Sequence, residues 1–497
     1  MKNLFCLFVA IFIFSDTVYS QTEFEDFLND IEQEFNTFRE ESFKEFDDFR
    51  NRINDEYINF LKEAWGEFNA SEGIAAPEEK EIPPVTYPED DEAELGIDAA
   101  PVPISIDEVI PVPESEPQPQ PVVEIEETPM PVDTRFSFGF FGNDMKVRLT
   151  DKHRFTLKGC DEYSIADGWS LLSGEEYNNV INDCLSIRSK LNLCDWAYLL
   201  MLDELSNSFF GKRCNEATLL TAFIYCQSGY KMRLANDNVS LFLLYASKHE
   251  IYDKSFWNLD GERYYCFGSD PNNLYICNAA YPDEKPLSLF IGGEQALALQ
   301  PSETRTLKSE KYGNITASVS TNRNLIDFYD TYPSSMINGD FGTRWAMYAN
   351  TPLSQQAKSS LYPTLSEAIR GMSGIDAANC LLNFVQTAFE YELDDKVWGG
   401  DRAFFPDETL FYPYCDCEDR SILFSRLVRD LLGLEVILVY YPGHIASAVC
   451  FSEPVGGDHV SLNGKNFTIC DPTYIGAPVG KTMPGMNNSS AKVILLE

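Results

Sequence analysis

A helix pattern followed by two strand patterns near the C-terminus constrains the fold of this chain more than any other feature. Residues 422–432 have the apolar pattern of a helix, and Gly433 follows where helices commonly end. Residues 435–441 then form an apolar run with Val-Ile-Leu-Val at its centre, which is typical of a buried strand. A second strand pattern ends at residue 470. We therefore expect an α+β fold with helix, strand and strand in this order.

Three residues with catalytic chemistry lie at the ends of these elements. Cys417 opens the helix, His444 follows the first strand and Asp471 closes the second, each of the last two 27 positions after its predecessor. A helix N-terminus lowers the pKa of a thiol. A histidine can pair with the thiolate and protonate a leaving group, and an aspartate fixes the imidazole tautomer. Each residue alone is more often structural, so the prediction of a catalytic site rests on the ordered set.

The same residues carry a family resemblance. The stretch Asp416-Cys417-Glu418-Asp419-Arg420-Ser421, the strand with His444 and the phrase Asp471-Pro472-Thr473 resemble the transglutaminase-like cysteine enzymes of the bacterial exported type. The resemblance implies a papain-like catalytic domain over residues 356–497, with Cys417 as nucleophile, His444 as base and Asp471 as orienting acid. Cys415 is the competing nucleophile, but Cys417 directly precedes the helix.

The resemblance also implies a reaction. Enzymes of this superfamily transfer, hydrolyse or deamidate acyl groups through a thioester, and peptide or protein amides are the expected substrates, with hydrolysis slightly favoured. The competing interpretation is a non-catalytic interaction or scaffold protein that retains the three residues. We expect the backbone N–H of Cys417 to stabilise an oxyanion. Trp398, Phe404, Phe405 and the stretch from Tyr412 to Tyr414 are expected to wall an acyl-binding groove.

The middle of the chain repeats part of this spacing. Cys214 begins a helix pattern that ends at Gly229, much as the later helix pattern begins at Cys417. The distance from Cys214 to Cys266 is 52 residues, and the distance from Cys417 to Cys470 is 53. This agreement predicts a second copy of the same unit.

The second copy lacks the catalytic chemistry. No histidine occurs in the strand expected around residues 239–244, and Phe267 stands where Asp471 stands in the later copy. We therefore predict that residues 134–280 form a degenerate transglutaminase-like unit that serves as scaffold or binding surface. Residues 281–355 are expected to form a β-rich connecting region.

The N-terminus has the pattern of a secretory signal peptide over residues 1–20. A short positive region precedes an apolar stretch at residues 4–14, and Ser20 marks the expected cleavage site. We expect an exported chain, periplasmic or secreted, without a transmembrane segment, because no later apolar run reaches membrane length. Its cysteines are expected to be either disulfides or buried thiols, since several lie in apolar helix or strand patterns.

An aromatic repeat follows the signal peptide. The motif Glu-Phe-x-x-Phe, with Tyr for the first Phe in one copy, recurs every 11 residues from Glu23 to Glu56, and a shortened copy, Glu67-Phe68, follows after the same interval. Eleven residues span three helical turns, so the aromatic side chains form one nearly straight stripe. We therefore predict a continuous amphipathic helix over residues 21–69. Its stripe is expected to be buried on the chain's own domain, in a coiled coil by self-association, or against a partner helix.

Residues 70–133 change abruptly in composition. Proline, glutamate and aspartate are frequent and aromatic residues are few, which is typical of a disordered tether. The whole chain has 38 basic and 78 acidic residues, a net charge of −40 that argues against nucleic acid and anionic membranes as partners. No EF-hand spacing accompanies this acidity, and we expect neither a cofactor nor a bound metal.

Overall fold

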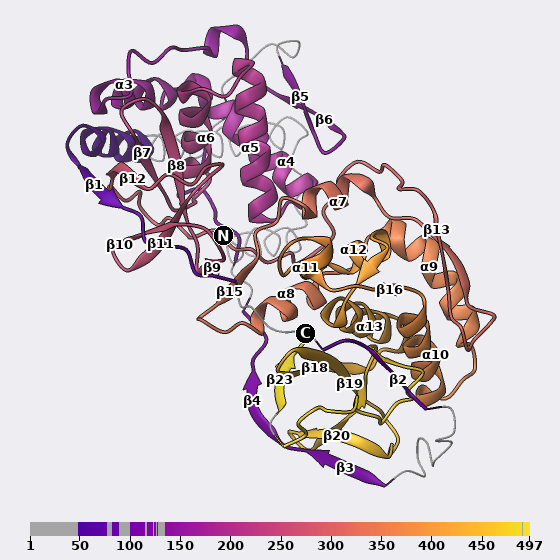
Figure 1. Ribbon diagram of the computed structural model, residues 1–497. Coiled ribbons are helices and arrows are strands. Elements are labelled where there is room, and N and C mark those ends of the chain that lie inside the picture. Colours follow the sequence, from indigo (N-terminus) through magenta and orange to yellow (C-terminus); the bar gives the residue numbers. More distant parts are fainter. Residues whose placement is uncertain are drawn as a thin grey trace, which may run out of the picture.

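The computed structural model has two lobes that lie against each other (Figure 1). We call them the middle unit, residues 135–280, and the C-terminal unit, residues 343–497. Both combine helices with a curled sheet, so the α+β class expected from the sequence is confirmed. The structure describes residues 48–76, 82–88, 100–114, 117–122, 124–125, 127, 135–489 and 491–497.

The sheet of the C-terminal unit has seven strands in the order β3-β20-β21-β19-β18-β23-β4. Its central strands are consecutive antiparallel neighbours, and helix α13 packs against β19 and β18. The strands contributed by this unit are β18 Glu435–Tyr441, β19 His444–Cys450, β20 Gly457–Leu462, β21 Lys465–Cys470 and β23 Ala491–Leu495.

Helix α13, Cys417–Leu432, begins and ends as its sequence predicts. Asp416 is the N-cap and accepts a hydrogen bond from the N–H of Asp419. Gly433 ends the helix with a φ of 66°, a left-handed conformation that glycine adopts without steric cost. The other helices of the unit are α8 Thr343–Asn350, α9 Gln355–Ala368, α10 Gly374–Thr387, α11 Asp394–Val397 and α12 Pro406–Phe411. Two short strands, β16 Glu390–Tyr391 and β17 Tyr414–Cys415, pair in parallel.

The middle unit has a six-stranded sheet in the order β1-β12-β7-β8-β11-β10. Helix α6 packs against β8 and β7, and α5 packs against α6. The hairpin β5 Phe136–Phe140 and β6 Asn143–Val147 lies beside α5 and α4. The helices are α3 Glu162–Leu172, α4 Asn178–Lys190, α5 Asp195–Phe210 and α6 Asn215–Gln227, and the strands are β7 Met232–Asn236, β8 Leu241–Ala246, β10 Phe256–Leu259, β11 Glu262–Cys266 and β12 Asn273–Cys277.

The two units share one topology. The order β12-β7-β8-β11-β10 in the middle unit corresponds strand for strand to β23-β18-β19-β21-β20 in the C-terminal unit. The register agrees as well, because Cys266 pairs with Leu244 and Cys470 pairs with Ser447 at the same place in each ladder. The cysteine spacing noticed in the sequence therefore marks equivalent positions in two similarly ordered sheets.

The region between the units is mixed rather than β-rich. The hairpin β13 Arg305–Lys308 and β14 Thr316–Val319 packs on α9, and its apolar residues join the core of the C-terminal unit. Helix α7, Arg323–Tyr329, contributes to the core of the middle unit instead. The prediction of a β-rich connection over residues 281–355 is therefore wrong for α7 and α8, where buried apolar residues recur at helical spacing. The remaining strands, β9 His249–Ile251 and β15 Ser335–Ile337, pair across the junction of the lobes.

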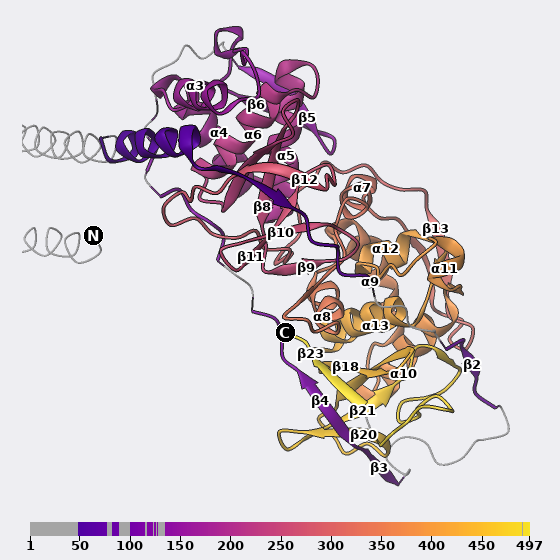
Figure 2. The ribbon, with the colours of Figure 1, turned by 60° about the vertical axis from the view of Figure 1, so that its left-hand side comes forward.

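The aromatic stripe of the N-terminal repeat is only partly helical. Residues 48–63 form a helix that lies on the middle unit, where Tyr57 packs on Trp169 and Tyr281 (Figure 2). Residues Trp65–Asn69 form β1, which pairs antiparallel with β12 at the edge of the sheet. A continuous helix to residue 69 is therefore the wrong prediction, because sheet pairing satisfies the backbone of these residues. Residues 21–47 lie outside the described residues, as does the predicted signal peptide.

Three parts of the predicted tether are strands of the C-terminal unit. β3 Pro101–Ile104 pairs in parallel with β20, and β4 Ile106–Ile110 pairs in parallel with β23, so they cover both edges of the sheet. β2 Val85–Thr86 pairs with β22 Tyr474–Ile475. The prediction of a disordered linker is wrong for these residues, because two exposed sheet edges offered backbone partners that composition cannot reveal.

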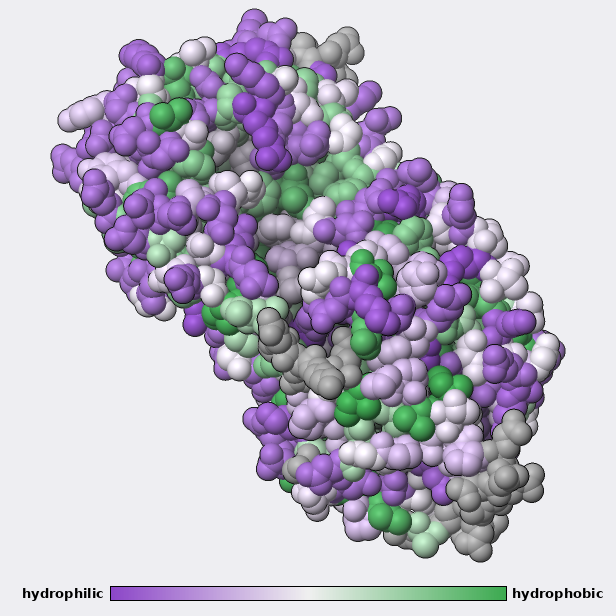
Figure 3. Space-filling model, viewed as in Figure 1, coloured by the Kyte–Doolittle hydropathy of each residue, from purple (hydrophilic) through white to green (hydrophobic). Residues whose placement is uncertain are grey.

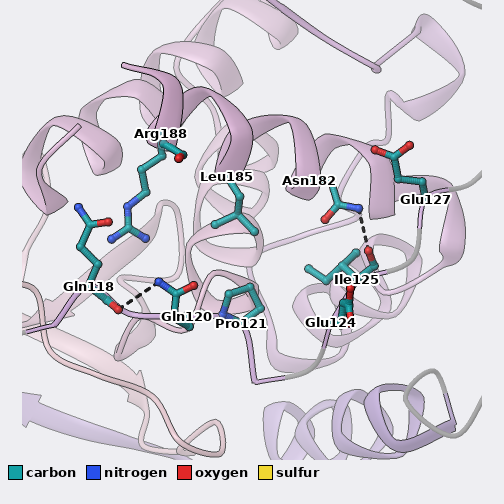
Figure 4. A pocket seen from close by; sticks show the side chains of 10 residues that line it. Gln118, Gln120, Pro121, Glu124, Ile125, Glu127, Asn182, Leu185 and Arg188 are labelled. Atoms are coloured by element: carbon teal, nitrogen blue, oxygen red, sulfur yellow. Dashed lines mark hydrogen bonds between the residues drawn. The ribbon is translucent and has the colours of Figure 1, made fainter. Parts of the chain in front are cut away.

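A further part of the predicted tether lies on the middle unit, along α4 (Figure 4). Arg188 donates a hydrogen bond to the carbonyl of Pro119 at 3.2 Å, and Asn182 donates to the carbonyl of Ile125 at 2.8 Å. Gly229 makes the closest approach, since an added Cβ would lie 2.0 Å from the Gln120 carbonyl oxygen. The described parts of the chain between residues 48 and 127 therefore contact both units in turn.

All twelve cysteines in the described part of the chain are free thiols, most of them buried. Of the two alternatives expected from the sequence, the buried thiol therefore applies to them. None of the helices in the described ranges combines the length and the apolarity needed to cross a membrane. Hydrophilic side chains dominate the face of both lobes seen in Figure 3.

Candidate active site

His444 and Asp471 form a buried pair in the C-terminal unit. His444 begins β19 and Asp471 follows β21, and these two strands are neighbours in the sheet. The imidazole Nε2 lies 2.9 Å from the Asp471 Oδ2, and both side chains are fully buried. Among the described residues the other ring nitrogen, Nδ1, has no hydrogen-bond partner. An ionised Asp471 therefore holds the proton on Nε2 and leaves Nδ1 ready to accept one.

The loop that carries Asp471 is rigidly held. Its Oδ1 accepts hydrogen bonds from the N–H groups of Thr473 and Tyr474 at 2.9 and 3.2 Å. Gln386, buried on α10, donates to the backbone carbonyls of Asp471, Tyr474 and Ala477 at 3.1, 2.8 and 3.0 Å. These bonds fix the carboxylate before any substrate binds, which is what an orienting acid requires.

Cys417 is the first residue of α13, and hydrogen bonds join the start of this helix to the strand of His444. Ser421 donates to the carbonyl of Ile445 at 2.9 Å, and Ser447 donates to the carbonyl of Ser421 at 3.1 Å. All of these residues are buried. The helix that carries the thiol is therefore fixed against the strand that carries the imidazole.

The thiol of Cys417 lies against a carboxylate, and its pKa is raised. It donates a hydrogen bond to Oε2 of Glu418 at 3.2 Å. Burial raises the pKa of Cys417 well above its usual value, and the charges of Glu418 and Asp416 raise it further, against a smaller lowering by the N–H of Ile445. The expectation that the helix N-terminus lowers this pKa is therefore wrong, because burial and two adjacent carboxylates outweigh the helix dipole.

Cys417 and His444 line the same cavity, which we call the Cys417 cavity. It has a volume of about 500 Å³ and lies where the two lobes meet. Its lining combines residues of the N-terminal segment and of the middle unit with Phe341 and residues of the C-terminal unit. The lining residues are Ala75, Ala76, Asp253, Phe341, Arg344, Trp345, Asp395, Gly399, Gly400, Asp401, Cys417, Glu418, Tyr440, Gly443, His444 and Ile445.

A buried arginine lies at the wall of the Cys417 cavity. Arg344 on α8 forms a two-pronged ion pair with Asp401, and its Nη2 lies 3.7 Å from Oε1 of Glu418. The guanidinium also lies over the rings of Phe341 and Trp345, 4.2 and 4.9 Å from their centroids. Arg344 therefore links the carboxylate beside Cys417 to the aromatic wall of the cavity.

Three carboxylates near the thiol have the spacing of metal ligands. One oxygen each of Asp394, Asp401 and Glu418 lies within 4.8 Å of the others, so this group could hold a divalent cation. Arg344 already supplies a positive charge to two of the three, which is the alternative way to neutralise a cluster of acids.

The aromatic residues expected to wall the groove lie elsewhere. Trp398, Phe404 and Tyr412 pack against one another, with centroid distances of 4.9 to 5.7 Å, and surround the guanidinium of Arg402. Trp398 and Phe405 line an adjoining cavity of about 340 Å³, which shares Gly399, Gly400 and Asp401 with the Cys417 cavity. The aromatic residues that line the Cys417 cavity itself are Phe341, Trp345 and Tyr440.

Cys415, the competing nucleophile, is not placed for catalysis. It lies on β17, it is buried, and its Sγ contacts the carbonyl oxygen of Glu390 at 3.9 Å. Burial raises its pKa to about 11. Of the two neighbouring cysteines, only Cys417 lines the cavity that contains His444.

The middle unit lacks the corresponding chemistry. The shared register places Leu241 at the position of His444 and Phe267 at the position of Asp471. Cys214 is the N-cap of α6 and hydrogen-bonds to Glu216. His249 has other neighbours, since Nε2 accepts from the N–H of Leu289 at 3.2 Å and Nδ1 lies 3.4 Å from the Ser335 hydroxyl.

Several residues of the cavity could not be recognised in the sequence. Arg344, Phe341 and Trp345 belong to an ordinary amphipathic helix and its N-terminal turn, about 70 residues before the nucleophile. Asp253 comes from the middle unit, in a turn between β9 and β10. No short motif contains them, because they meet only where the two lobes join.

Comparisons of the chain with protein-family models, with curated proteins and with solved structures found no match. The transglutaminase-like resemblance therefore remains a prediction from the residues quoted above.

Proposed function

We propose that this protein is an exported cysteine hydrolase or acyltransferase that acts on peptide or protein amide bonds through a thioester on Cys417. The observation that carries the proposal is the buried His444–Asp471 pair, because His444 lines the same cavity as Cys417 and its Nδ1 has no hydrogen-bond partner among the described residues. A histidine that is oriented by a carboxylate and shares a cavity with a cysteine at a helix N-terminus has the arrangement of a nucleophile and its base.

The first half of the reaction forms the acyl-enzyme. His444 Nδ1 accepts the thiol proton as Sγ of Cys417 attacks the carbonyl carbon of the amide. The oxyanion that results faces the first turn of α13, where the N–H of Cys417 has no acceptor within the helix. The imidazolium then gives its proton to the amine, the C–N bond breaks, and the acyl group remains on sulfur as a thioester.

The second half releases the acyl group. Water, or an amine in the transferase version, loses a proton to His444 as it attacks the thioester carbonyl. The C–S bond breaks, and the proton on His444 returns to the departing thiolate. Asp471 stays ionised throughout and stabilises the imidazolium in both halves.

The raised pKa of Cys417 bears on when the thiol loses its proton in the first step. Because the resting thiol is protonated and hydrogen-bonds to Glu418, we infer that deprotonation accompanies attack and does not precede it. This version resembles general-base catalysis by a serine–histidine pair more than attack by a preformed thiolate–imidazolium pair.

The test is labelling of the full chain with a thiol-directed acyl probe, followed by mapping of the modified residue. The proposal expects modification of Cys417, loss of labelling in Cys417→Ala and normal labelling in Cys415→Ala. Labelling that persists in Cys417→Ala, or that is lost in Cys415→Ala, contradicts the assignment of the nucleophile.

A binding or scaffold protein is the second candidate function. The observation that favours it is the burial of Cys417, whose side chain is 2% exposed and hydrogen-bonded to a carboxylate. A chain that shows neither labelling nor turnover on a mixture of denatured proteins, with His444→Ala indistinguishable from the parent, would support this candidate.

A further inference from the structure

The Cys417 cavity is strongly acidic. Four carboxylates line it, those of Asp253, Asp395, Asp401 and Glu418, against the single guanidinium of Arg344. His444 also lines the cavity, with its Nε2 on Asp471. The wall therefore has an excess of negative charge, on a chain whose net charge is −40.

The positive charge of Arg344 is paired with carboxylates of the cavity wall. Its two terminal nitrogens pair with Asp401, and one of them also approaches Glu418. Arg344 is fully buried, and it packs against the Phe341 and Trp345 rings. Because Arg344 is paired with these acids, its charge is largely neutralised. An anionic ligand would therefore find no unpaired cation among the residues that line the cavity.

Asp253 and Asp395 are the two carboxylates of the cavity that are not paired with Arg344. Both side chains are exposed, and neither forms an ion pair with any residue in the described part of the chain. Asp253 has a φ of 52°, and its N–H donates to the carbonyl of Ile74 at 2.8 Å, so its turn is fixed by the N-terminal segment. Asp395 is on α11 of the other lobe. The two acids therefore lie on opposite sides of the junction, in one cavity.

Aromatic rings complete the environment. Trp345 and Tyr440 are stacked with centroids 5.4 Å apart, and both line the cavity. Ring faces attract ammonium and guanidinium groups, and the guanidinium of Arg344 already lies over Trp345. Low-dielectric walls of one charge sign also concentrate ligands of the opposite sign.

We infer that the Cys417 cavity recognises a cationic side chain, lysine or arginine, on the peptide whose amide reacts at Cys417, with Asp253 and Asp395 as the specificity-determining residues. This inference rests on the proposed function, and it names the substrate class of the same site. It also excludes recognition of a free C-terminal carboxylate at this position, because such a group would face the two unpaired acids.

The experiment compares two small methanethiosulfonate reagents on the full chain, one with a trimethylammonium group and one with a sulfonate group. The rate of modification of Cys417 is measured by mass spectrometry at low ionic strength, and each rate is divided by that of the same reagent with a free thiol. We expect the normalised rate to favour the cation by about tenfold or more, in the range of electrostatic focusing. Cys450, which is half-buried and far from this cavity, is the internal reference and should show a smaller preference.

The decisive variant is Asp253→Asn combined with Asp395→Asn. Asparagine tolerates the left-handed conformation at position 253, so the turn should be kept. The double variant should lose most of the preference at Cys417. The matched control, Asp107→Asn combined with Asp144→Asn, removes the same charge from exposed positions outside the cavity. This control should retain the preference for the cationic reagent at Cys417.

Equal normalised rates in the parent chain, or a preference that survives the double variant, overturn the inference. Failure of the cationic reagent to modify Cys417 also overturns it, since a cation would then not enter the cavity. Disulfide formation with these reagents needs neither His444 nor turnover. Loss of the charge preference with intact acyl-probe labelling would therefore contradict the inference but not the proposed enzyme. A charge preference without acyl-probe labelling would support the cation-binding cavity but contradict the proposed enzyme.

Discussion

The middle and C-terminal units have the same strand order and the same register, yet among the described residues only the C-terminal unit has a His–Asp pair whose histidine shares a cavity with a cysteine. Equivalent positions hold His444 and Leu241 in one case, and Asp471 and Phe267 in the other. Apolar residues packed on both sides of the sheet stabilise the fold, and many combinations of apolar side chains can fill such a core. This topology therefore does not depend on the side chains at the positions of His444 and Asp471.

The N-terminal segment adds a second contrast. It gives β1 to the edge of the middle sheet, but it gives β3 and β4 to both edges of the C-terminal sheet. It also places Ala75 and Ala76 in the Cys417 cavity. One cluster of buried apolar residues extends from the middle unit to Phe405 and Ile445, so the two units are packed as one body.

The largest expected effect separates the two helix-initial cysteines. Cys417→Ala should abolish turnover and acyl-probe labelling, because no other thiol lines the cavity of His444 among the described residues. Cys214→Ala, at the equivalent position of the middle unit, should leave both unchanged. Labelling that depends on Cys214 would break the comparison and make the middle unit a second active site.

The next effect concerns the imidazole and its partner. His444→Ala should lower kcat/KM by several orders of magnitude, as for linked triads, and Asp471→Asn should lower it less, because Nδ1 can still accept a proton in part of the molecules. Steady-state kinetics on a common peptide substrate would measure both. As the control, Phe267→Leu in the middle unit should leave kcat/KM unchanged, and a large loss there would contradict a purely structural role for that position.

A smaller effect concerns the pH dependence of alkylation by iodoacetamide. The pKa of Cys417 is raised, so the thiolate is the minor form at neutral pH and the rate should increase as the pH rises through 9 and beyond. Cys214 has a raised pKa too, but it is less buried, so it should react faster at each pH. The alkylation rates of Cys214 and Cys417, measured by mass spectrometry at each pH, test which of the two cysteines reacts faster. A rate at Cys417 that is already at its plateau below pH 7 would reveal a thiolate–imidazolium pair instead.

The smallest effect compares the two glycines that end the equivalent helices. At Gly433 an added Cβ meets no atom within 4 Å, so Gly433→Ala should cost about 1–2 kcal/mol of the free energy of unfolding, the cost of a left-handed conformation. At Gly229 the Cβ would also collide with the backbone of Gln120, so Gly229→Ala should cost more and release the segment at residues 117–122. Chemical denaturation measures both, and equal costs would show that this segment adapts without loss.

Local patterns in the sequence determined much of the C-terminal unit. The helix from Cys417 to Gly433, the strand that follows it and the strand that ends before Asp471 were all predictable, because their burial follows from periodicity and their ends from capping residues. The spacing from Cys214 to Cys266 likewise marked a second copy. The pair formed by His444 and Asp471 was predictable from their order alone.

Only the tertiary structure decided the properties of the site. The raised pKa of Cys417 comes from burial beside Glu418, and the acidic cavity comes from Asp253 of one lobe meeting Asp395 of the other. The strands at residues 101–110 exist because two sheet edges lacked partners, although their own composition is typical of a tether. Sequence patterns record what each segment buries on its own face, whereas charge and pairing between distant segments depend on which surfaces the fold brings together.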